Sequence, residues 1–356
     1  MSHPVLTGET SLRRIDIDHL ARAKDPGLAT EFHRWPLPDY IWPALERCYH
    51  SIYCSEPQLR ISGSVTPRTE AWVARRDGSI SAVILFDRNQ HHVRVLNEVF
   101  SLSSQVLSEF ADAVFGLYPK LRVIRIRAIK IANLPKPTIG LSTDISDDYR
   151  LKLPTTKEDW YRSLSARTRE KLRYYLRRAQ QRAPTFSFRT FSADDINLEQ
   201  IKQIIQFNRA RMQVKGKRFG MSANEQHQLC QLMLERGWLS TIEIDGKPSA
   251  GLLCTLAGGD VFMHVIAHDP AHDDLRLGFL CCALTIEEAI AKGYQQFHFL
   301  WGRYDYKTRL GGESEVLSQV SLFRDWSACL RQPADWWVHA LALTRTWLRR
   351  KRQHQH

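Results

Sequence analysis

The most constraining feature of this sequence is a hairpin pattern that occurs twice. An Asp-Gly pair separates two β-rich runs at Asp77-Gly78 and again at Asp245-Gly246. Such a pair between alternating apolar residues is typical of the two-residue turn of a β-hairpin. Residues 77–82 align with residues 245–250 without a gap, and four of the six positions are identical. The shared offset of 168 residues favours an internal duplication over two unrelated segments.

The elements expected after each hairpin also come in one order, which is a strand, a helix and a strand. They fall at residues 93–100, 104–117 and 121–129 in the first half and at 261–268, 278–292 and 294–301 in the second. Residues 135–148, which hold two prolines and a Ser-Thr-Asp run, are expected to be a linker. Strands that alternate with helices predict an α/β fold, built from two tandem mixed β-sheet units flanked by helices.

A length of 356 residues is enough for about two domains. We expect an N-terminal unit over residues 1–150 with an irregular lead-in through the first forty residues, a C-terminal unit over 151–330, and a basic, aromatic tail over 331–356. Between the halves, helices are predicted at residues 159–182 and 197–212, and from a capping box at Ser222 and Glu225 up to Gly237.

The charge balance indicates an anionic partner. Lys and Arg number 50 against 38 Asp and Glu, which leaves a net charge of +12. The seven cysteines form no C-x-x-C pair, so neither a disulfide framework nor a metal site is expected. No secretion signal is found, and no apolar run approaches the roughly 18–20 residues that span a bilayer. We therefore expect a cytoplasmic protein, either free or peripheral at the inner membrane.

A basic helix is predicted directly after the first unit. Seven Lys and Arg residues stand between Arg167 and Arg182, and Arg169, Arg173 and Arg177 are spaced four apart on one face. This face is expected either to contact an anionic group such as a phosphate or to be a solvated surface. Nucleic acid is not expected as the partner, because no zinc-finger, RNP or helix-turn-helix pattern accompanies the charge.

The strand at residues 261–268 carries two histidines. Strict alternation would place His264 and His268 on the same face. A histidine that projects from a central strand can act as a general base at neutral pH. Either residue can equally be a core histidine with its hydrogen bonds satisfied. Metal binding by this pair together with His272 is not expected, because the spacing on a strand separates the rings too far.

Two further segments follow predicted strands and can hold a ligand. The loop before the helix at residue 278 contains Arg276 and Gly278, and the backbone N–H groups of such a helix start can bind a pyrophosphate. Gly278 can also serve tight packing alone. The strand at 294–301 ends in a segment rich in aromatic and ionisable groups, at the sheet edge where α/β proteins bind ligands. Its members are Trp301, Gly302, Arg303, Tyr304, Asp305, Tyr306 and Lys307.

The tail combines aromatic and basic residues. Trp336, Trp337 and Trp347 precede the basic run at residues 349–352. Aromatic residues beside a basic cluster can dock at an anionic membrane surface. The alternative is a C-terminal helix that closes the core.

Two motifs resemble those of a known family. The segment Trp160-Tyr-Arg-Ser-Leu-Ser-Ala-Arg-Thr-Arg169, with the basic helix after it, resembles the start of the cellulose-biosynthesis (CelD-like) acetyltransferases, a branch of the GNAT superfamily. The segment from Phe299 to Tyr306-Lys307 is similar to the Tyr-Lys element of that branch in its spacing. The resemblance covers residues 150–325, and the first half resembles the degenerate first unit of tandem GNAT proteins. The Fem-type peptidoglycan aminoacyltransferases share this layout.

The resemblance implies two GNAT-like units and acyl transfer from acyl-CoA, without a metal, to an amine-bearing anionic small molecule or saccharide of an envelope or exopolysaccharide precursor. It implies His264 or His268 as the base and Tyr304 or Tyr306 as the acid for the leaving thiolate. The expected cofactor contacts are the backbone of Val265, Ile266 and Ala267 with Arg276, Gly278 and Lys307, and the expected acceptor contacts are Arg169, Arg173, Arg177, Trp301, Arg303 and Asp305. Two further possibilities are a Fem-like aminoacyl-tRNA-dependent transferase and a non-catalytic module that binds anionic surfaces.

Overall fold

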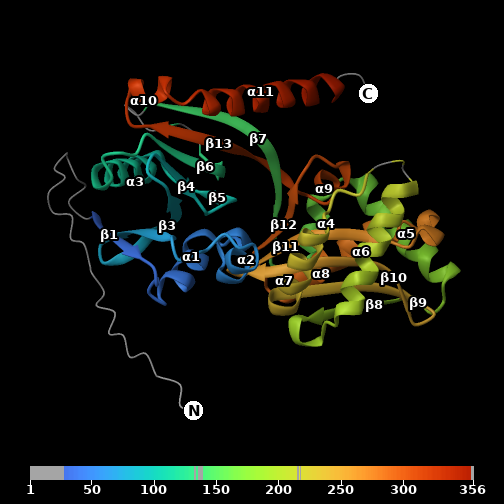
Figure 1. Ribbon diagram of the computed structural model, residues 1–356. Coiled ribbons are helices and arrows are strands. Elements are labelled where there is room, and N and C mark those ends of the chain that lie inside the picture. The colour runs from blue at the N-terminus through green and yellow to red at the C-terminus, as the bar shows by residue number, and fades with distance from the viewer. Residues whose placement is uncertain (1–27, 132–133, 135–138, 215, 217, 354–356) are drawn as a thin grey trace, which may run out of the picture.

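The computed structural model describes residues 28–131, 134, 139–214, 216 and 218–353. It is an α/β protein with two tandem units of mixed β-sheet flanked by helices (Figure 1). The first half contains β1 (Leu28–Arg34), α1 (Ile41–Tyr49), η1 (Ile52–Cys54), α2 (Glu56–Ile61), β2 (Glu70–Arg76), β3 (Ser79–Arg88), β4 (His92–Val95), β5 (Phe100–Ser101), α3 (Ser104–Leu117), β6 (Val123–Lys130) and β7 (Ile139–Lys152). The second half contains α4 (Lys157–Ser163), α5 (Ala166–Arg182), β8 (Ser187–Ser192), η2 (Ala193–Asp195), α6 (Leu198–Val214), α7 (Ala223–Arg236), β9 (Gly237–Ile244), β10 (Lys247–Ala257), β11 (Asp260–His268), η3 (Pro270–Leu275), α8 (Leu277–Ala291), β12 (Gln296–Trp301), α9 (Asp305–Arg309), β13 (Glu313–Phe323), α10 (Trp326–Leu330) and α11 (Pro333–Gln353).

The two halves share one sheet. Among the described residues its strand order is β1-β2-β3-β4-β6-β13-β7-β12-β11-β10-β9-β8, with β5 beside β6. The last strand of each half lies among strands of the other half, because β13 pairs with β6 and β7 pairs with β12. β7 and β13 also pair with each other along almost their whole length. The halves therefore cannot separate without breaking β-ladders.

Both predicted hairpins are confirmed. β2 pairs with β3 and β9 pairs with β10, each around its Asp-Gly turn. The turn residues have positive φ angles, +49° and +78° at Asp77 and Gly78 and +51° and +69° at Asp245 and Gly246. These are the left-handed conformations that a two-residue turn needs to match the twist of its strands. The order β1-α1-α2-β2-β3-β4-α3-β6-β7 returns as β8-α6-α7-β9-β10-β11-α8-β12-β13.

The predicted linker at residues 135–148 is wrong for its described part. Residues 139–148 belong to β7, a strand of 14 residues in the middle of the sheet, while Pro135 and Pro137 lie outside the described residues. The Ser, Thr and Asp content of this segment is typical of a loop, but β13 and β12 supply the backbone hydrogen bonds of a strand. These partners lie more than a hundred residues away in the chain, so no local signal announces them.

Three smaller predictions also change. The irregular lead-in contains β1, which pairs with β2. The strand expected at residues 93–100 is divided into β4 and β5, because the buried Asn97 side chain binds the backbone of Leu85 and Val83 at 2.8 and 3.0 Å in place of a ladder. The helix expected at 159–182 is two helices, since Ser165 caps a new helix by accepting from the backbone of Thr168.

The second half has three layers. Helices α5 and α8 pack on one face of strands β9–β11, and α6 and α7 pack on the other. The capping box predicted at Ser222 and Glu225 is confirmed at the start of α7. Within the described part of the chain, every helix is too short or too polar to cross a membrane.

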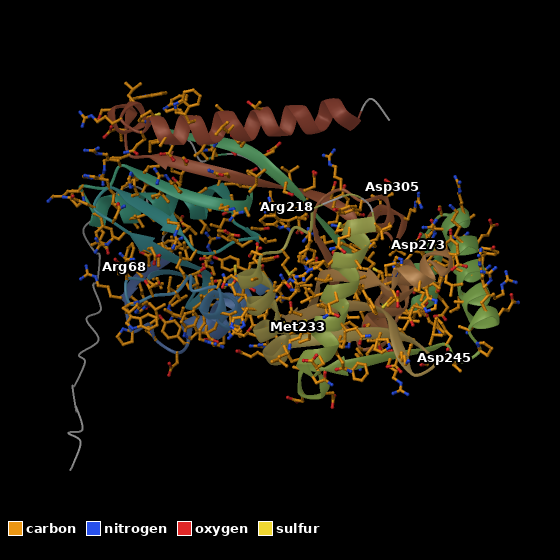
Figure 2. All side chains as sticks on the ribbon, turned by 45° about the vertical axis from the view of Figure 1, so that its right-hand side comes forward. Arg68, Arg218, Met233, Asp245, Asp273 and Asp305 are labelled. Atoms are coloured by element: carbon orange, nitrogen blue, oxygen red, sulfur yellow. The ribbon has the colours of Figure 1, made fainter. Side chains whose placement is uncertain are left out.

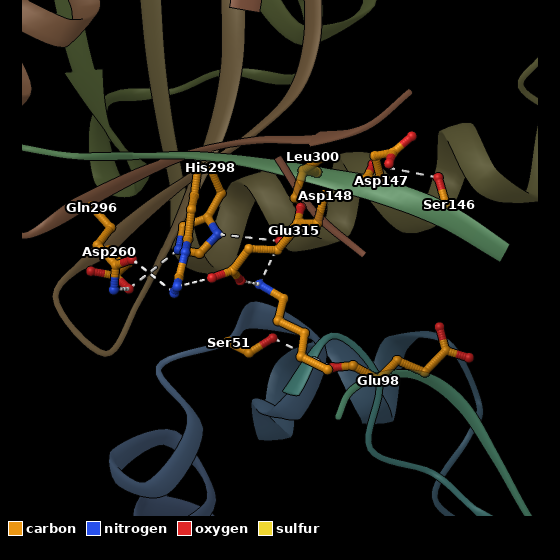
Figure 3. A network of polar contacts seen from close by, with 12 residues as sticks. Ser51, Glu98, Ser146, Asp147, Asp148, Asp260, Gln296, His298, Leu300 and Glu315 are labelled. Carbon is orange, nitrogen blue, oxygen red and sulfur yellow. Dashed lines mark hydrogen bonds and ion pairs between the residues drawn. The ribbon is translucent and has the colours of Figure 1, made fainter. Parts of the chain in front are cut away.

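A polar network joins the halves in the interior (Figure 3). The Lys130 ammonium on β6 lies 2.8 Å from a carboxylate oxygen of Asp148 on β7 and 3.0 Å from Glu315 on β13. On the other side of Asp148, His298 of β12 contacts Asp260 of β11 at 3.3 Å. Asp148 and Asp260 are fully buried, so their carboxylates are stabilised by these contacts within the protein and not by water.

Candidate functional site

The strands β11 and β12 diverge after a short stretch of pairing. They are parallel neighbours at only two positions, Val261 with Phe297 and Phe262 with His298. β11 then continues to His268 against β10 alone, and β12 continues to Trp301 against β7. Among the described residues no strand pairs with this edge of β11 beyond Phe262. We call this divergence of β11 and β12 the slot; backbone groups on the edge of β11 that have no strand partner there can bind a ligand.

In the first half, the strands that correspond to β11 and β12 do not diverge in this way. Its β6 pairs with β4 at residues 92–94 and again with β5 at residues 100–101. Between these two points the backbone N–H of Val99 donates to the carbonyl of Ala128 at 2.8 Å. A slot like that of the second half is therefore absent from the described residues of the first half, which points to the second half as the functional unit.

His264 occupies a β-bulge beside this slot. Leu253 pairs with Val265 and Cys254 pairs with Met263, so His264 is the extra residue of β11. Its Nε2 atom lies 2.8 Å from the Thr255 hydroxyl oxygen. Burial lowers the pKa of His264 to about 4, so the imidazole is neutral near pH 7. A neutral imidazole has a lone pair that can accept a proton or a hydrogen bond.

His264 also lines a pocket of about 270 Å³ on the α6–α7 side of the sheet. The residues that line it are Ile205, Asn208, Phe219, Gly220, Met221, Glu225, His264 and Val265. The Glu225 carboxylate accepts from the hydroxyl and the backbone N–H of Ser222, and these bonds lower its pKa. The pocket therefore presents a carboxylate, an amide and a neutral imidazole, which suits an amine.

The depressed pKa of His264 predicts a pH-dependent stability. As the pH falls through the ordinary value of ~6.5, the unfolded chain binds a proton that the folded chain takes up only near pH 4. The stabilisation is complete above pH 6.5 and is lost towards pH 4. When the pH is lowered from 7 to 4.5, the unfolding free energy of the parent should fall by about 2–3 kcal/mol more than that of the His264→Gln variant. Urea unfolding at the two pH values measures the difference. Equal losses in the two proteins would contradict this.

The other candidate base, His268, lies on the opposite face. The bulge at His264 breaks the alternation of β11, so the prediction that both histidines share one face is wrong. His268 is buried against α8, where its Nδ1 atom lies 3.1 Å from the place of a Cβ on Gly278, and its Nε2 is 3.0 Å from Asp273. A side chain at position 278 would therefore crowd His268, which explains the glycine by packing. His268 is not among the residues that line the pocket.

The start of α8 lies next to His268. Arg276 precedes the helix with a φ of +56°, and its side chain is exposed and makes no capping hydrogen bond. The N-terminus of a helix of this length carries partial positive charge and backbone N–H groups without helical partners. The predicted contact of Arg276 and Gly278 with a pyrophosphate stays a prediction.

The segment after β12 is arranged around Lys307. Its buried ammonium donates to the carbonyls of Leu300 and Trp301 at 2.7 and 2.9 Å, and burial lowers its pKa to about 8. Lys307 thus holds the end of β12, and its predicted contact with a cofactor phosphate stays a prediction. Tyr306 packs its ring against Phe299, and burial raises the pKa of its phenol, whereas Tyr304 is exposed.

Two of the predicted acceptor residues of this segment, Arg303 and Trp301, contact the first half. Arg303 forms a bidentate pair with Asp147 of β7, and Trp301 stacks on Tyr53 at 6.4 Å between ring centres. Asp305 is exposed at the start of α9. These contacts tie the end of β12 to the first half.

The arginines predicted to form the basic face of α5 differ in their surroundings. Arg169 donates to the carbonyls of Tyr161, Arg162 and Leu164 and so closes the end of α4. Arg173 and Arg177 are exposed. The helix packs on α8 through Tyr175 and Phe279, and its Arg178 and Arg182 pair with Asp274 in the loop before α8. At 3.6 residues per turn, Arg173 and Arg177 lie on another side of α5 from Tyr175, Arg178 and Arg182, so it is not the predicted basic face that contacts α8.

Comparison with known proteins finds similarity to one protein family and to several solved structures. Residues 166–308, from the start of α5 into α9, match the family profile described as "Acetyltransferase (GNAT) domain". A sequence search of curated proteins finds no match. The matched segment contains the β11–β12 slot, the His264 pocket and the start of α8.

Solved structures superpose on most of this chain. The crystal structure of FemX superposes with a TM-score of 0.58 and 10% identity, over 80% of this chain and 96% of that chain. A conserved protein of unknown function from Bacteroides thetaiotaomicron gives 0.49 and 13%, over 80% and 96%. A tandem GNAT protein from the clavulanic acid biosynthesis pathway gives 0.40 and 10%, over 83% and 98%. The fold prediction is confirmed, and the cellulose-biosynthesis branch is not among these similarities.

Proposed function

We propose that this chain is an acyl-CoA-dependent N-acyltransferase whose active site lies in the second half. The observation that carries the proposal is the slot between β11 and β12 beside the pocket of His264. A thioester in this slot would meet backbone N–H groups on one side and an amine in the pocket on the other. The match of residues 166–308 to a GNAT acetyltransferase domain supports acyl-CoA as the donor and an amine as the acceptor.

The donor contacts follow from the exposed charges around the slot. Arg276 and the start of α8 are suited to the pyrophosphate of CoA. Arg173 and Arg177 are exposed on α5, which packs on α8, and they supply further positive charge. The backbone N–H groups of residues 265–267 are proposed to hold the oxyanion that forms on the thioester carbonyl.

The reaction is a direct transfer. His264 takes the proton from the amine as the nitrogen attacks the thioester carbonyl, so that a C–N bond forms and the C–S bond breaks. Tyr304 or Tyr306 gives a proton to the departing thiolate. Lys307 acts as a positioning residue, because its ammonium already binds two carbonyls at the end of β12.

The acceptor is proposed to be an amine on an anionic small molecule or a saccharide of an envelope or exopolysaccharide precursor. The Glu225 carboxylate in the pocket favours an ammonium or amine, and the net charge of +12 favours an acceptor with acidic groups elsewhere. Acetyl is the simplest acyl group for a pocket of this size.

A second candidate is a transfer from aminoacyl-tRNA. The observation that favours it is the likeness of the fold to that of FemX, which extends over 80% of this chain. Binding of tRNA with a steep salt dependence and no affinity for acetyl-CoA would support this candidate, or a non-catalytic module, against the first.

Isothermal titration calorimetry with acetyl-CoA tests the proposal. The parent should bind, and Arg276→Glu should weaken binding about tenfold, because it reverses a charge near the pyrophosphate. Arg68→Glu makes the same charge change on the exposed surface of the first half, far from Asp273 of the loop before α8 (Figure 2), and should leave binding unchanged. A parent that does not bind acetyl-CoA would contradict the proposal.

A further inference from the structure

Helix α11 is attached to the protein by its polar side. Of the α11 side chains that the structure describes, Asp335 and His339 are buried, 3% and 4% exposed. Asp335 forms a bidentate pair with Arg125 of β6 at 2.7 and 2.8 Å and accepts from Ser321 at 3.1 Å. His339 contacts Thr143 at 2.7 Å and Ser321 at 3.0 Å. A helix that docks on a sheet normally buries an apolar stripe, whereas the described first turns of α11 bury an acid and a histidine.

The outward side of α10 and α11 is apolar instead. We call it the outer face, and it consists of Trp326, Leu330, Trp337, Val338 and Leu341. Trp326, Leu330 and Trp337 are 69%, 76% and 70% exposed. In Figure 1, α11 lies along the outside of the molecule over β7 and β13, so this face points to solvent. Large apolar side chains grouped on one surface indicate an interaction site.

The sequence of α11 adds positive charge to the same helix. No acidic residue follows Asp335, whereas Arg345, Arg349, Arg350, Lys351 and Arg352 come in its last turns. The described start of α11 is therefore apolar and rich in tryptophan, and the sequence of the helix ends in basic residues.

We infer that the outer face of α10 and α11 binds the surface of an anionic lipid bilayer. Tryptophan prefers the boundary between headgroups and acyl chains, and Lys and Arg are attracted to anionic headgroups. A second copy of this chain fits less well, because two such faces would bring two sets of basic residues together. The inference does not depend on the proposed acyl transfer, since the outer face lies apart from the slot and pocket.

Vesicle flotation of the full chain tests the inference. The parent should float with vesicles that contain phosphatidylglycerol, float less with pure phosphatidylcholine, and dissociate as salt is raised. The double variant Trp337→Glu with Leu341→Glu should reduce the partition coefficient about tenfold or more, because it removes two apolar anchors and adds two negative charges. Both residues are exposed, so the thermal midpoint should stay near that of the parent.

A matched control makes the same changes elsewhere. Val214→Glu with Leu234→Glu alters two exposed apolar residues on α6 and α7, and its partition should stay within about twofold of the parent. The inference is overturned if the two double variants partition alike. It is also overturned if the parent ignores phosphatidylglycerol vesicles and elutes as a dimer that the Trp337→Glu, Leu341→Glu variant dissociates, since a second copy would then cover the outer face.

Discussion

Replacing His264 by alanine should lower kcat/KM for amine acylation by about 10²–10⁴-fold, the usual cost of losing a general base. The imidazole lines the pocket and, with its lowered pKa, is unprotonated throughout the neutral range. The loss should therefore be constant between pH 6 and pH 8, because the state of His264 does not change there. Steady-state kinetics with acetyl-CoA and a panel of amines measures it.

Two variants separate this role from a structural one. Thr255→Val keeps the imidazole and removes its hydrogen bond, so it should cost less than the loss of His264. His268→Ala alters the other histidine of β11, which lies on the α8 face, and should change kcat by less than about threefold. If His264→Ala retained kcat/KM within about threefold of the parent while remaining folded, the base would have to be another group.

Replacing Lys130 by methionine should destabilise the fold by about 3–5 kcal/mol, which is the typical cost of leaving a buried charge without its partner. Asp148 is fully buried and loses its 2.8 Å contact with the ammonium. Glu315 loses the same cation and retains Arg150. Because these residues come from β6, β7 and β13, the loss is expected to loosen the junction of the halves. Urea unfolding at pH 7 measures the change.

The double variant Lys130→Met with Asp148→Asn should recover a large part of that loss, since it removes the unpaired charge as well. Lys152→Met is the matched control. Lys152 is exposed at the end of β7, so the unfolding free energy of this variant should stay within about 0.5 kcal/mol of that of the parent. A Lys130→Met variant as stable as the Lys152→Met control would show that the network contributes nothing to the junction.

The parts of the fold that could be predicted have short-range causes. The Asp-Gly turns need positive φ angles that few residues adopt easily, so both hairpins are visible in the sequence. The helix at residues 104–117 shows an apolar period, and the capping box of α7 is a four-residue signal. β7 has no such signal, because its polar residues become a strand only when β12 and β13 pair with them.

The candidate site divides in the same way. His264 could be chosen from the sequence because a histidine on a predicted strand is chemically conspicuous. The face of the sheet on which His264 lies could not be predicted, because the bulge depends on how β10 and β11 pair. Three residues from other elements contact His264 or line its pocket, namely Thr255, Asn208 and Glu225. Of these, the sequence singles out only Glu225, and it does so as part of a helix cap and not as a site residue.

From the sequence alone follow the doubled hairpin, the α/β class and the types of residue available for chemistry, because turn conformations and apolar periods involve neighbours in the chain. Only the tertiary structure decides that β7 and β13 exchange places between the halves, that β11 and β12 diverge in the second half while the first half is closed, and that α11 presents its apolar side to solvent. These features arise from hydrogen bonds and ion pairs between residues that are far apart in the chain, whose pairing depends on the packing of the whole molecule.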